Sequence, residues 1–195
     1  MTKFDKAIEI IDSYNNQDPT LTIIDEKSFP NEFLYSVRLT NWVKKLDSTP
    51  SEELLIAARS QHICRWKIPR STFETNRKGY LQWRSQLAKF HAEKTGEILT
   101  EIGYDKLFIE KVQNLNRKTL LKKGDKDAQT LEDALCLVFL EFQLNDFIKK
   151  YAYEKEKISI IIQKTWKKMS KKGQQEAMKL KYNDKIHRLI EKALQ

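Results

Sequence analysis

LEDALCLVFLEF, residues 131–142, is the stretch that decides the fold class of this chain. Apolar side chains occupy almost every side of a helix drawn through it, including Leu135, Leu137 and Val138. A helix that is apolar all round has to be enclosed by other elements. We therefore predict that these residues form the central helix of an all-α bundle.

Segments on both sides of this stretch carry apolar residues at helical spacing. These further helices are predicted at residues 3–14, around 33–43, and at 51–66, 80–102, 105–123, 153–169, 171–180 and 184–194. Loops are predicted up to Pro30 and over residues 67–79. The chain holds only 5 Gly and 4 Pro, too few for the turns of a β-sandwich or barrel or for a Gly-rich nucleotide loop. The sequence predicts a single helical domain over residues 1–195.

Several residues mark the predicted helix ends. Thr49, Pro50 and Glu52 fit a capping box with proline at the first helical position. Glycines are placed to end two helices, and polar residues are placed to begin two others. These are Gly103 and Gly124 at C-termini, and Ser170 and Asn183 at N-termini.

The sequence also bears on where the protein resides. No apolar run reaches the roughly 18 to 20 residues that span a bilayer, and the N-terminus mixes charged with apolar residues, unlike an export signal. Cys64 and Cys136 lie inside apolar helical patterns, which favours buried, reduced thiols over a disulfide. We expect a protein without a membrane partner, in the cytoplasm or the nucleus.

A formal net charge of +9 predicts attraction to anions such as nucleotides, RNA or acidic partners. The alternative is that lysine serves only as a solubilising surface residue, especially in the C-terminal part of the chain.

Three residues form a candidate metal site. His62 and His91 each share a helix face with apolar residues, and Asp133 lies in the central helix. Two imidazoles and a carboxylate are good ligands for one divalent metal such as Mn, Fe or Zn. The alternatives are core histidines bonded to the backbone, and a capping box from Thr130 to Asp133 at a helix N-terminus.

The order and separations of His62, Phe90-His91-Ala92 and Leu131-Glu132-Asp133-Ala134 resemble the HD superfamily of metal-dependent phosphohydrolases. The resemblance implies an HD-like core over about residues 51–145, with N- and C-terminal helical extensions and a bound divalent metal (Mn, Fe, Zn or Mg). One departure is Ala92, which stands where that superfamily has an aspartate that commonly helps to hold the metals. With alanine at this position, the resemblance implies either one metal bound by His62, His91 and Asp133 or a site that binds no metal and has only a structural role.

Nearly the whole chain resembles an uncharacterised family of short fungal and bacterial proteins, the domain of unknown function DUF4202. The stretches that carry this resemblance are residues 31–35, 57–66, 79–84, 129–141 and 164–166. It implies no substrate.

Basic and aromatic residues alternate near the two histidines. One guanidinium group can bind two phosphate oxygens at once, and an aromatic ring can stack on a nucleobase. The predicted phosphate-binding residues are Arg59, Arg65, Arg70, Arg77, Lys78 and Arg84, and the predicted stacking residues are Trp66, Tyr80 and Trp83. The alternative is that the tryptophans belong to the core and that the arginines pair with surface acids.

These features lead to two functional expectations. The first is a divergent HD-type, metal-dependent phosphohydrolase acting on a phosphorylated small molecule or nucleotide, with Glu132 or Glu141 as general base and the metal activating water. The second is a non-catalytic helical module that binds RNA or a nucleotide through phosphate contacts.

Overall fold

The computed structural model describes residues 1–194, and it describes all of their side chains except those of Lys185, Ala193 and Leu194. The helices are α1 (Lys3–Asn15), α2 (Asn31–Leu46), α3 (Glu52–Ser60), α4 (Arg77–Ile102), α5 (Lys106–Asn116), α6 (Lys126–Val138), α7 (Leu144–Lys150), α8 (Lys155–Lys168), α9 (Lys171–Met178) and α10 (Asp184–Leu194). A small antiparallel sheet pairs β1 (Leu21–Ile24) with β2 (Lys27–Pro30). The predicted all-α class is confirmed.

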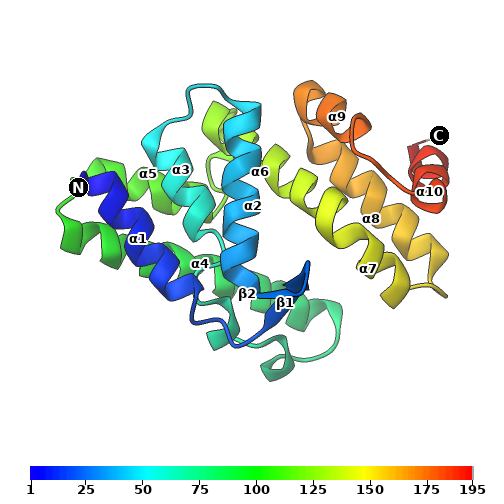
Figure 1. Cartoon of the computed structure of the whole chain (residues 1–195), viewed down its shortest axis with the longest axis horizontal. Coiled ribbons are helices and arrows are strands. Elements are labelled where there is room, and N and C mark those ends of the chain that lie inside the picture. The colour runs from blue at the N-terminus through cyan, green and yellow to red at the C-terminus, as the bar shows by residue number, and fades with distance from the viewer. Residues whose placement is uncertain (195) are drawn as a thin grey trace.

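Helix α6 is the centre of the fold, as its apolar sequence predicts. It packs against α2, α3, α5, α8 and α9. Figure 1 shows α2 and α6 between one group of helices, α1 and α3 to α5, and a second group, α8 to α10. Ala134, Leu137 and Val138 of α6 are fully buried.

The start of α6 differs from one sequence-based alternative. The helix begins five residues before Leu131, and Asp125 caps it by accepting a hydrogen bond of 2.9 Å from the backbone N–H of Ala128. Thr130 and Asp133 therefore lie inside the helix, and the capping box proposed for them is wrong. Asp133 is consequently free to bond to another element.

The predicted helix over residues 51–66 is shorter in the structure. Ser51, not Thr49, is the N-cap, and α3 ends at Ser60. A tight turn follows because Cys64 adopts a left-handed backbone conformation with φ of 54°, after which Arg65–Lys67 form a short 3-10 helix. His62 lies in this turn and not on a continuous helix.

The predicted helix over residues 105–123 is likewise interrupted. α5 ends at Asn116, and Lys118 has a positive φ of 61°. This conformation is costly for a residue with a Cβ atom. It turns the chain and brings the Lys118 ammonium to Glu132 of α6. Gly103 and Gly124 adopt the left-handed conformation predicted for them, with φ of 89° and 73°.

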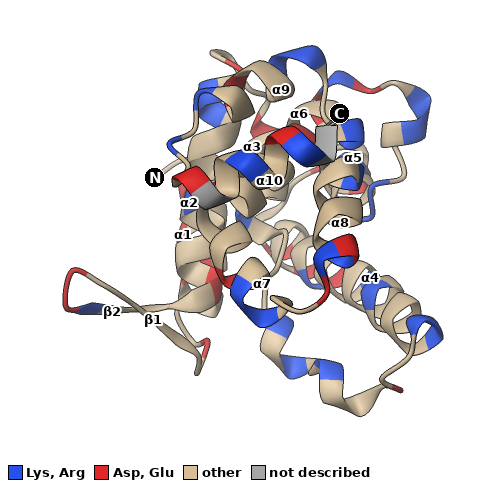
Figure 2. Cartoon of the chain, turned by 90° about the vertical axis from the view of Figure 1, so that its right-hand side faces the viewer, with Lys and Arg blue, Asp and Glu red and all other residues tan. Residues whose placement is uncertain are grey.

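The segment before Pro30, predicted as a loop, contains the β-hairpin. Asp25 and Glu26 form its two-residue turn, both with positive φ, which suits the right-handed twist of the paired strands. Figure 2 shows the hairpin projecting from the helices. Ile23 on this arm is 73% exposed.

Two predictions from composition can be compared with the structure. No described helix is long and apolar enough to cross a membrane. Cys64 and Cys136 are both buried with free thiols.

Candidate functional site

A cleft of about 670 Å³ opens between α2, the turn after α3, the first turns of α4, the end of α6 and helix α8. Its lining is rich in basic side chains, with aromatic and acidic groups between them. The basic residues are Arg38, Arg65, Arg84, Lys118, Lys164 and Lys168; the aromatic ones are Tyr35, Tyr80, Phe139 and Phe142; and the lining also includes His62, Cys136 and the carboxyl groups of Glu32, Glu132 and Asp146. With His62 neutral, the six basic side chains outnumber the three carboxylates, so the lining of the cleft carries a net positive charge.

Glu32, His62 and Arg65 form one hydrogen-bonded group in the cleft wall. His62 Nδ1 lies 3.1 Å from Glu32 Oε2, and His62 Nε2 lies 3.2 Å from Arg65 Nη1. A guanidinium can only donate, so Nε2 must accept and Nδ1 must carry the proton that it donates to Glu32. The tautomer of His62 follows from its two partners.

The surroundings of this group keep His62 neutral. Burial lowers the pKa of His62 well below its usual value, and the charges of Arg65 and Arg84 lower it further. The Tyr35 ring stacks on the imidazole at 4.1 Å between centroids, which covers one face of the ring. The imidazole therefore retains a lone pair on Nε2 at neutral pH.

Glu32 has an unusual pKa for a carboxyl group. Burial raises it from 4.5 to about 7, although the nearby charge of Arg65 acts in the opposite direction. Arg65 Nε lies 3.6 Å from Glu32 Oε1, and the side chain of Glu32 is only 11% exposed. Glu32 therefore titrates near physiological pH.

A second ionic group lies at Glu132, one of the two predicted general bases. Its carboxylate is 2.5 Å from Lys118 Nζ and 3.4 Å from Lys168 Nζ. Burial raises the pKa of Glu132, but the charges and hydrogen bonds of the two lysines lower it by more, so the pKa lies below its usual value. Glu141, the other predicted base, is not among the lining residues; it accepts a hydrogen bond of 2.7 Å from Trp42 Nε1.

Three of the lining cations have no carboxylate within ion-pair distance among the side chains that the structure describes. They are Arg38, Arg84 and Lys164. The guanidinium of Arg38 lies 4.0 Å from the centroid of the Phe142 ring, a cation–π contact that leaves its N–H donors available. The cleft thus holds three cations without an ion-pair partner among the described side chains, and we call them the unneutralised cations, although the charge of Glu141 acts on Arg38 at longer range.

Of the three predicted metal ligands, His62 and His91 lie near each other, whereas Asp133 bonds to another element. His91 lies near His62, with 5.9 Å between ring centroids, and its Nδ1 donates to the backbone oxygen of Ile63 at 2.8 Å. Asp133 instead faces α9. Its carboxylate accepts hydrogen bonds from the backbone N–H of Ser170 (2.8 Å), from Ser170 Oγ (2.5 Å) and from Gln129 Nε2 (2.9 Å).

The residues present do not fit the divalent metal that the HD resemblance implies. Both oxygens of Asp133 are hydrogen-bonded, and His62 Nε2 faces a guanidinium, whose positive charge disfavours a cation. Ala92 offers no ligand atom. No group of three or more His, Cys, Asp or Glu residues in the described part of the chain is arranged to hold a metal ion. The predicted site on His62, His91 and Asp133 is therefore corrected: Asp133 is a structural residue.

Several predicted phosphate-binding residues lie elsewhere. Arg59 pairs with Asp12 at 2.5 and 2.6 Å, and Arg70 donates to backbone oxygens of its own loop, including that of Phe73. Arg77 and Lys78 are exposed at the start of α4, outside the lining. Of the predicted set, Arg65 and Arg84 line the cleft.

Of the three predicted stacking residues, Tyr80 lines the cleft and the two tryptophans do not. Tyr80 lines the cleft and is 44% exposed. Trp83 is buried, donates from Nε1 to the backbone oxygen of Ile68 at 2.9 Å, and supports the guanidinium of Arg65 at 4.8 Å from its ring. Trp66 packs half-buried against the core. The two tryptophans thus follow the alternative interpretation as packing residues.

Comparison with known proteins identifies a family for this chain. A family model described as a domain of unknown function, DUF4202, matches residues 5–190. The chain belongs to this family. Comparisons with curated proteins and with solved structures found no significant match.

Sequence reasoning missed much of the cleft of this DUF4202 domain. The lining residues it did not select include Glu32, Tyr35, Arg38, Lys118, Phe142, Lys164 and Lys168. A signal existed for some of them, because Glu32, Tyr35 and Lys164 lie in stretches that carry the DUF4202 resemblance. Lys118 carried no local signal, since a lysine with positive φ cannot be anticipated from its neighbours.

Proposed function

We propose that the cleft binds a phosphorylated small molecule of the nucleotide class. The observation that carries this proposal is the set of three unneutralised cations, Arg38, Arg84 and Lys164, on three different helices around one cavity. Phosphate groups are the ligands best matched to convergent guanidinium and ammonium groups. Arg65, Lys118 and Lys168 lie in the same lining, where an anion can compete for them with Glu32 and Glu132.

The shape and the aromatic content support a small ligand. A volume of about 670 Å³ lies in the usual range of small-molecule pockets. Tyr80, which lines the cleft and is 44% exposed, provides a ring face on which a nucleobase can stack, whereas one face of Phe142 is covered by Arg38. A long RNA is less well matched, because Lys and Arg on the side of the molecule seen in Figure 2 are spread over several helices with acidic residues between them.

Hydrolysis of the bound phosphoester is a second proposal, and it is the one that the sequence resemblance of residues 51–145 to the HD superfamily suggests. The observation that favours it is a neutral imidazole, His62, held by a carboxylate in the wall of the same cleft. In this proposal His62 takes part in the reaction, and no step depends on the predicted metal ligands, because Asp133 is hydrogen-bonded to Ser170 next to α9.

Thermal unfolding with added anions tests the binding proposal. We expect inorganic pyrophosphate, AMP or ATP to raise the Tm by several degrees, because a ligand at about 100 times its Kd stabilises the folded state by about 3 kcal/mol. Arg84→Ala should lose most of this shift, whereas Lys78→Ala, on the same helix but outside the cleft, should keep it.

Two results would contradict the binding proposal. One is the absence of a shift with each of these anions. The other is an equal loss of the shift in Arg84→Ala and Lys78→Ala, which would indicate diffuse attraction to a basic surface. Binding only to single-stranded RNA, with a steep dependence on salt, would instead support the nucleic-acid alternative.

A further inference from the structure

His62 offers a nucleophile inside the proposed anion cleft. Its Nε2 lone pair points at the guanidinium of Arg65, 3.2 Å away, and no carboxylate lies on that nitrogen. The ring is 21% exposed and belongs to the cleft lining. This nitrogen is therefore a nucleophilic atom 3.2 Å from the guanidinium that would hold a phosphate.

The three neighbours of His62 match the needs of a nucleophilic imidazole. Glu32 accepts the Nδ1 proton at 3.1 Å, which fixes the reactive tautomer and can stabilise the positive charge that forms on the ring. Tyr35 stacks on the ring within 10° of parallel and holds its orientation. Arg84 and Lys118, also in the lining, can neutralise the phosphoryl oxygens.

Arg65 places an incoming phosphoryl group next to Nε2. A guanidinium has N–H donors on several sides, and only Nη1 is bonded to His62. Phosphate oxygens that bind the remaining donors lie beside the ring nitrogen, and phosphate is a stronger acceptor than neutral imidazole. The anion can therefore draw Arg65 away from Nε2 and occupy its place.

We infer that His62 Nε2 is a catalytic residue that accepts a phosphoryl group and forms a phosphohistidine. The inference rests on the proposed binding of phosphorylated ligands in this cleft and deepens it. The Nε2 lone pair attacks phosphorus, an N–P bond forms, and the bond from phosphorus to the leaving group breaks, with its electron pair departing on the leaving group. Water then attacks phosphorus, the N–P electron pair returns to Nε2, and the two protons of the water leave with the phosphoryl group as dihydrogen phosphate.

Glu32 has a positioning role in this reaction. Its carboxyl group contacts Nδ1 of the imidazole and the guanidinium of Arg65, so it acts through the tautomer of His62. Imidazole ¹⁵N chemical shifts report this role directly. Arg65 still donates to Nε2 in Glu32→Gln, whose amide oxygen can still accept from Nδ1, so we expect a single Nδ1–H tautomer in the wild-type protein and in Glu32→Gln. A mixture is expected only in the double variant Glu32→Leu, Arg65→Leu, a change that loss of packing alone would not produce.

The reaction can be tested with phosphoramidate, which donates a phosphoryl group to imidazoles and releases neutral ammonia. We expect the full-length protein to gain one phosphoryl group that is labile in acid and stable in alkali, and peptide fragmentation should locate it on His62. His187 is a control within the same chain, because it is 55% exposed and lies outside the cleft. His62 should be labelled about tenfold faster or more, since it is oriented beside bound phosphate.

The outcomes separate this inference from the binding proposal. His62→Asn should lose the label, and a cooperative thermal unfolding transition shows that the variant is folded, while pyrophosphate binding is measured on the wild type. A label on His187 alone, or no label while pyrophosphate still binds the wild type, overturns the phosphohistidine and leaves the binding proposal standing. Absence of both label and pyrophosphate binding overturns both.

Discussion

Glu32 shows how two opposing electrostatic effects decide the state of one residue. Burial disfavours the charged form of Glu32, and the positive charge of Arg65 favours it. Burial has the larger effect, so the pKa of Glu32 rises to about 7. The folded protein therefore retains a proton on Glu32 over a pH range in which the unfolded chain has lost it. Glu32 adds stability that is fully present below about pH 4.5 and is lost as the pH rises through about 7.

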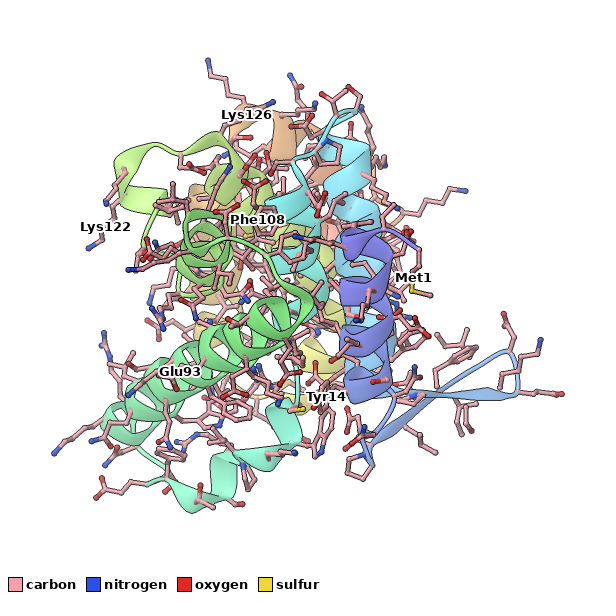
Figure 3. All side chains as sticks on the ribbon, turned by 90° about the vertical axis from the view of Figure 1, so that its left-hand side faces the viewer. Met1, Tyr14, Glu93, Phe108, Lys122 and Lys126 are labelled. Atoms are coloured by element: carbon pink, nitrogen blue, oxygen red, sulfur yellow. The ribbon has the colours of Figure 1, made fainter. Side chains whose placement is uncertain are left out.

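Glu32→Gln should remove this pH dependence. Between pH 4.5 and pH 8 the wild type should lose up to about 3 kcal/mol of unfolding free energy relative to the variant, as expected for a shift of this size. Urea unfolding at several pH values measures the difference. Glu93→Gln provides the control for removing an exposed carboxylate, since Glu93 lies on α4 (Figure 3) and is not among the residues that line the cleft. Parallel pH profiles of wild type and Glu32→Gln would contradict the account.

Residue types and spacing were sufficient to select His62, Arg65, Tyr80 and Arg84, because all four lie in or near one irregular segment. They were insufficient for Arg59, whose partner Asp12 is 47 residues away and neutralises it. Whether an arginine is free to bind an anion depends on such distant partners, and a single sequence does not reveal them.

At the scale of elements, the junction of α6 and α7 shapes the cleft. The five residues Phe139–Gln143 form a π-helical segment between the two helices. Wider helical turns of this kind rotate the following residues relative to a regular α-helix and are frequent at functional sites. Phe139, Phe142 and Gln143 of this segment line the cleft. The apolar pattern predicted the burial of α6 but could not indicate the extra residue in the turn.

Docking of α9 on α6 depends on Asp133. We expect Asp133→Ala to lower the unfolding free energy by about 3 kcal/mol, because a buried carboxylate that accepts three hydrogen bonds is removed. Denaturant unfolding with EDTA or with added Mn²⁺ should give the same loss in both conditions. A loss that appears only with Mn²⁺ would restore Asp133 as a metal ligand.

Gly173 of α9 tests the same contact from the other side. A Cβ atom there would lie 2.7 Å from Asp133 Cγ, which is too close unless the carboxylate moves. Gly173→Ala should therefore cost about 2 kcal/mol, although alanine normally stabilises a helix by about 1 kcal/mol relative to glycine. Lys171→Ala, exposed in the same helix, should change stability by less than about 0.5 kcal/mol. A stabilised Gly173→Ala would show that α9 is not held closely against Asp133.

Over the whole molecule, the net charge of +9 is unevenly neutralised. Many surface lysines are paired with acids within their own helix, such as Lys89 with Glu93 and Lys149 with Asp146. Arg38, Arg84 and Lys164 come from α2, α4 and α8 and meet only in the folded chain. The all-α class and the central helix could be predicted from periodicity, whereas this convergence could not, because it depends on how the helices pack.

Calorimetric titration with inorganic pyrophosphate measures the central claim most directly. The triple variant Arg38→Ala, Arg84→Ala, Lys164→Ala removes the unneutralised cations of the cleft. Its control, Arg77→Ala, Lys78→Ala, Lys122→Ala, removes the same formal charge from exposed positions, of which Lys122 projects at the edge of the molecule (Figure 3). We predict a Kd raised about tenfold or more in the cleft variant and by less than about twofold in the control. Equal effects of the two variants, or unchanged binding in both, would contradict the proposal that this cleft is the binding site.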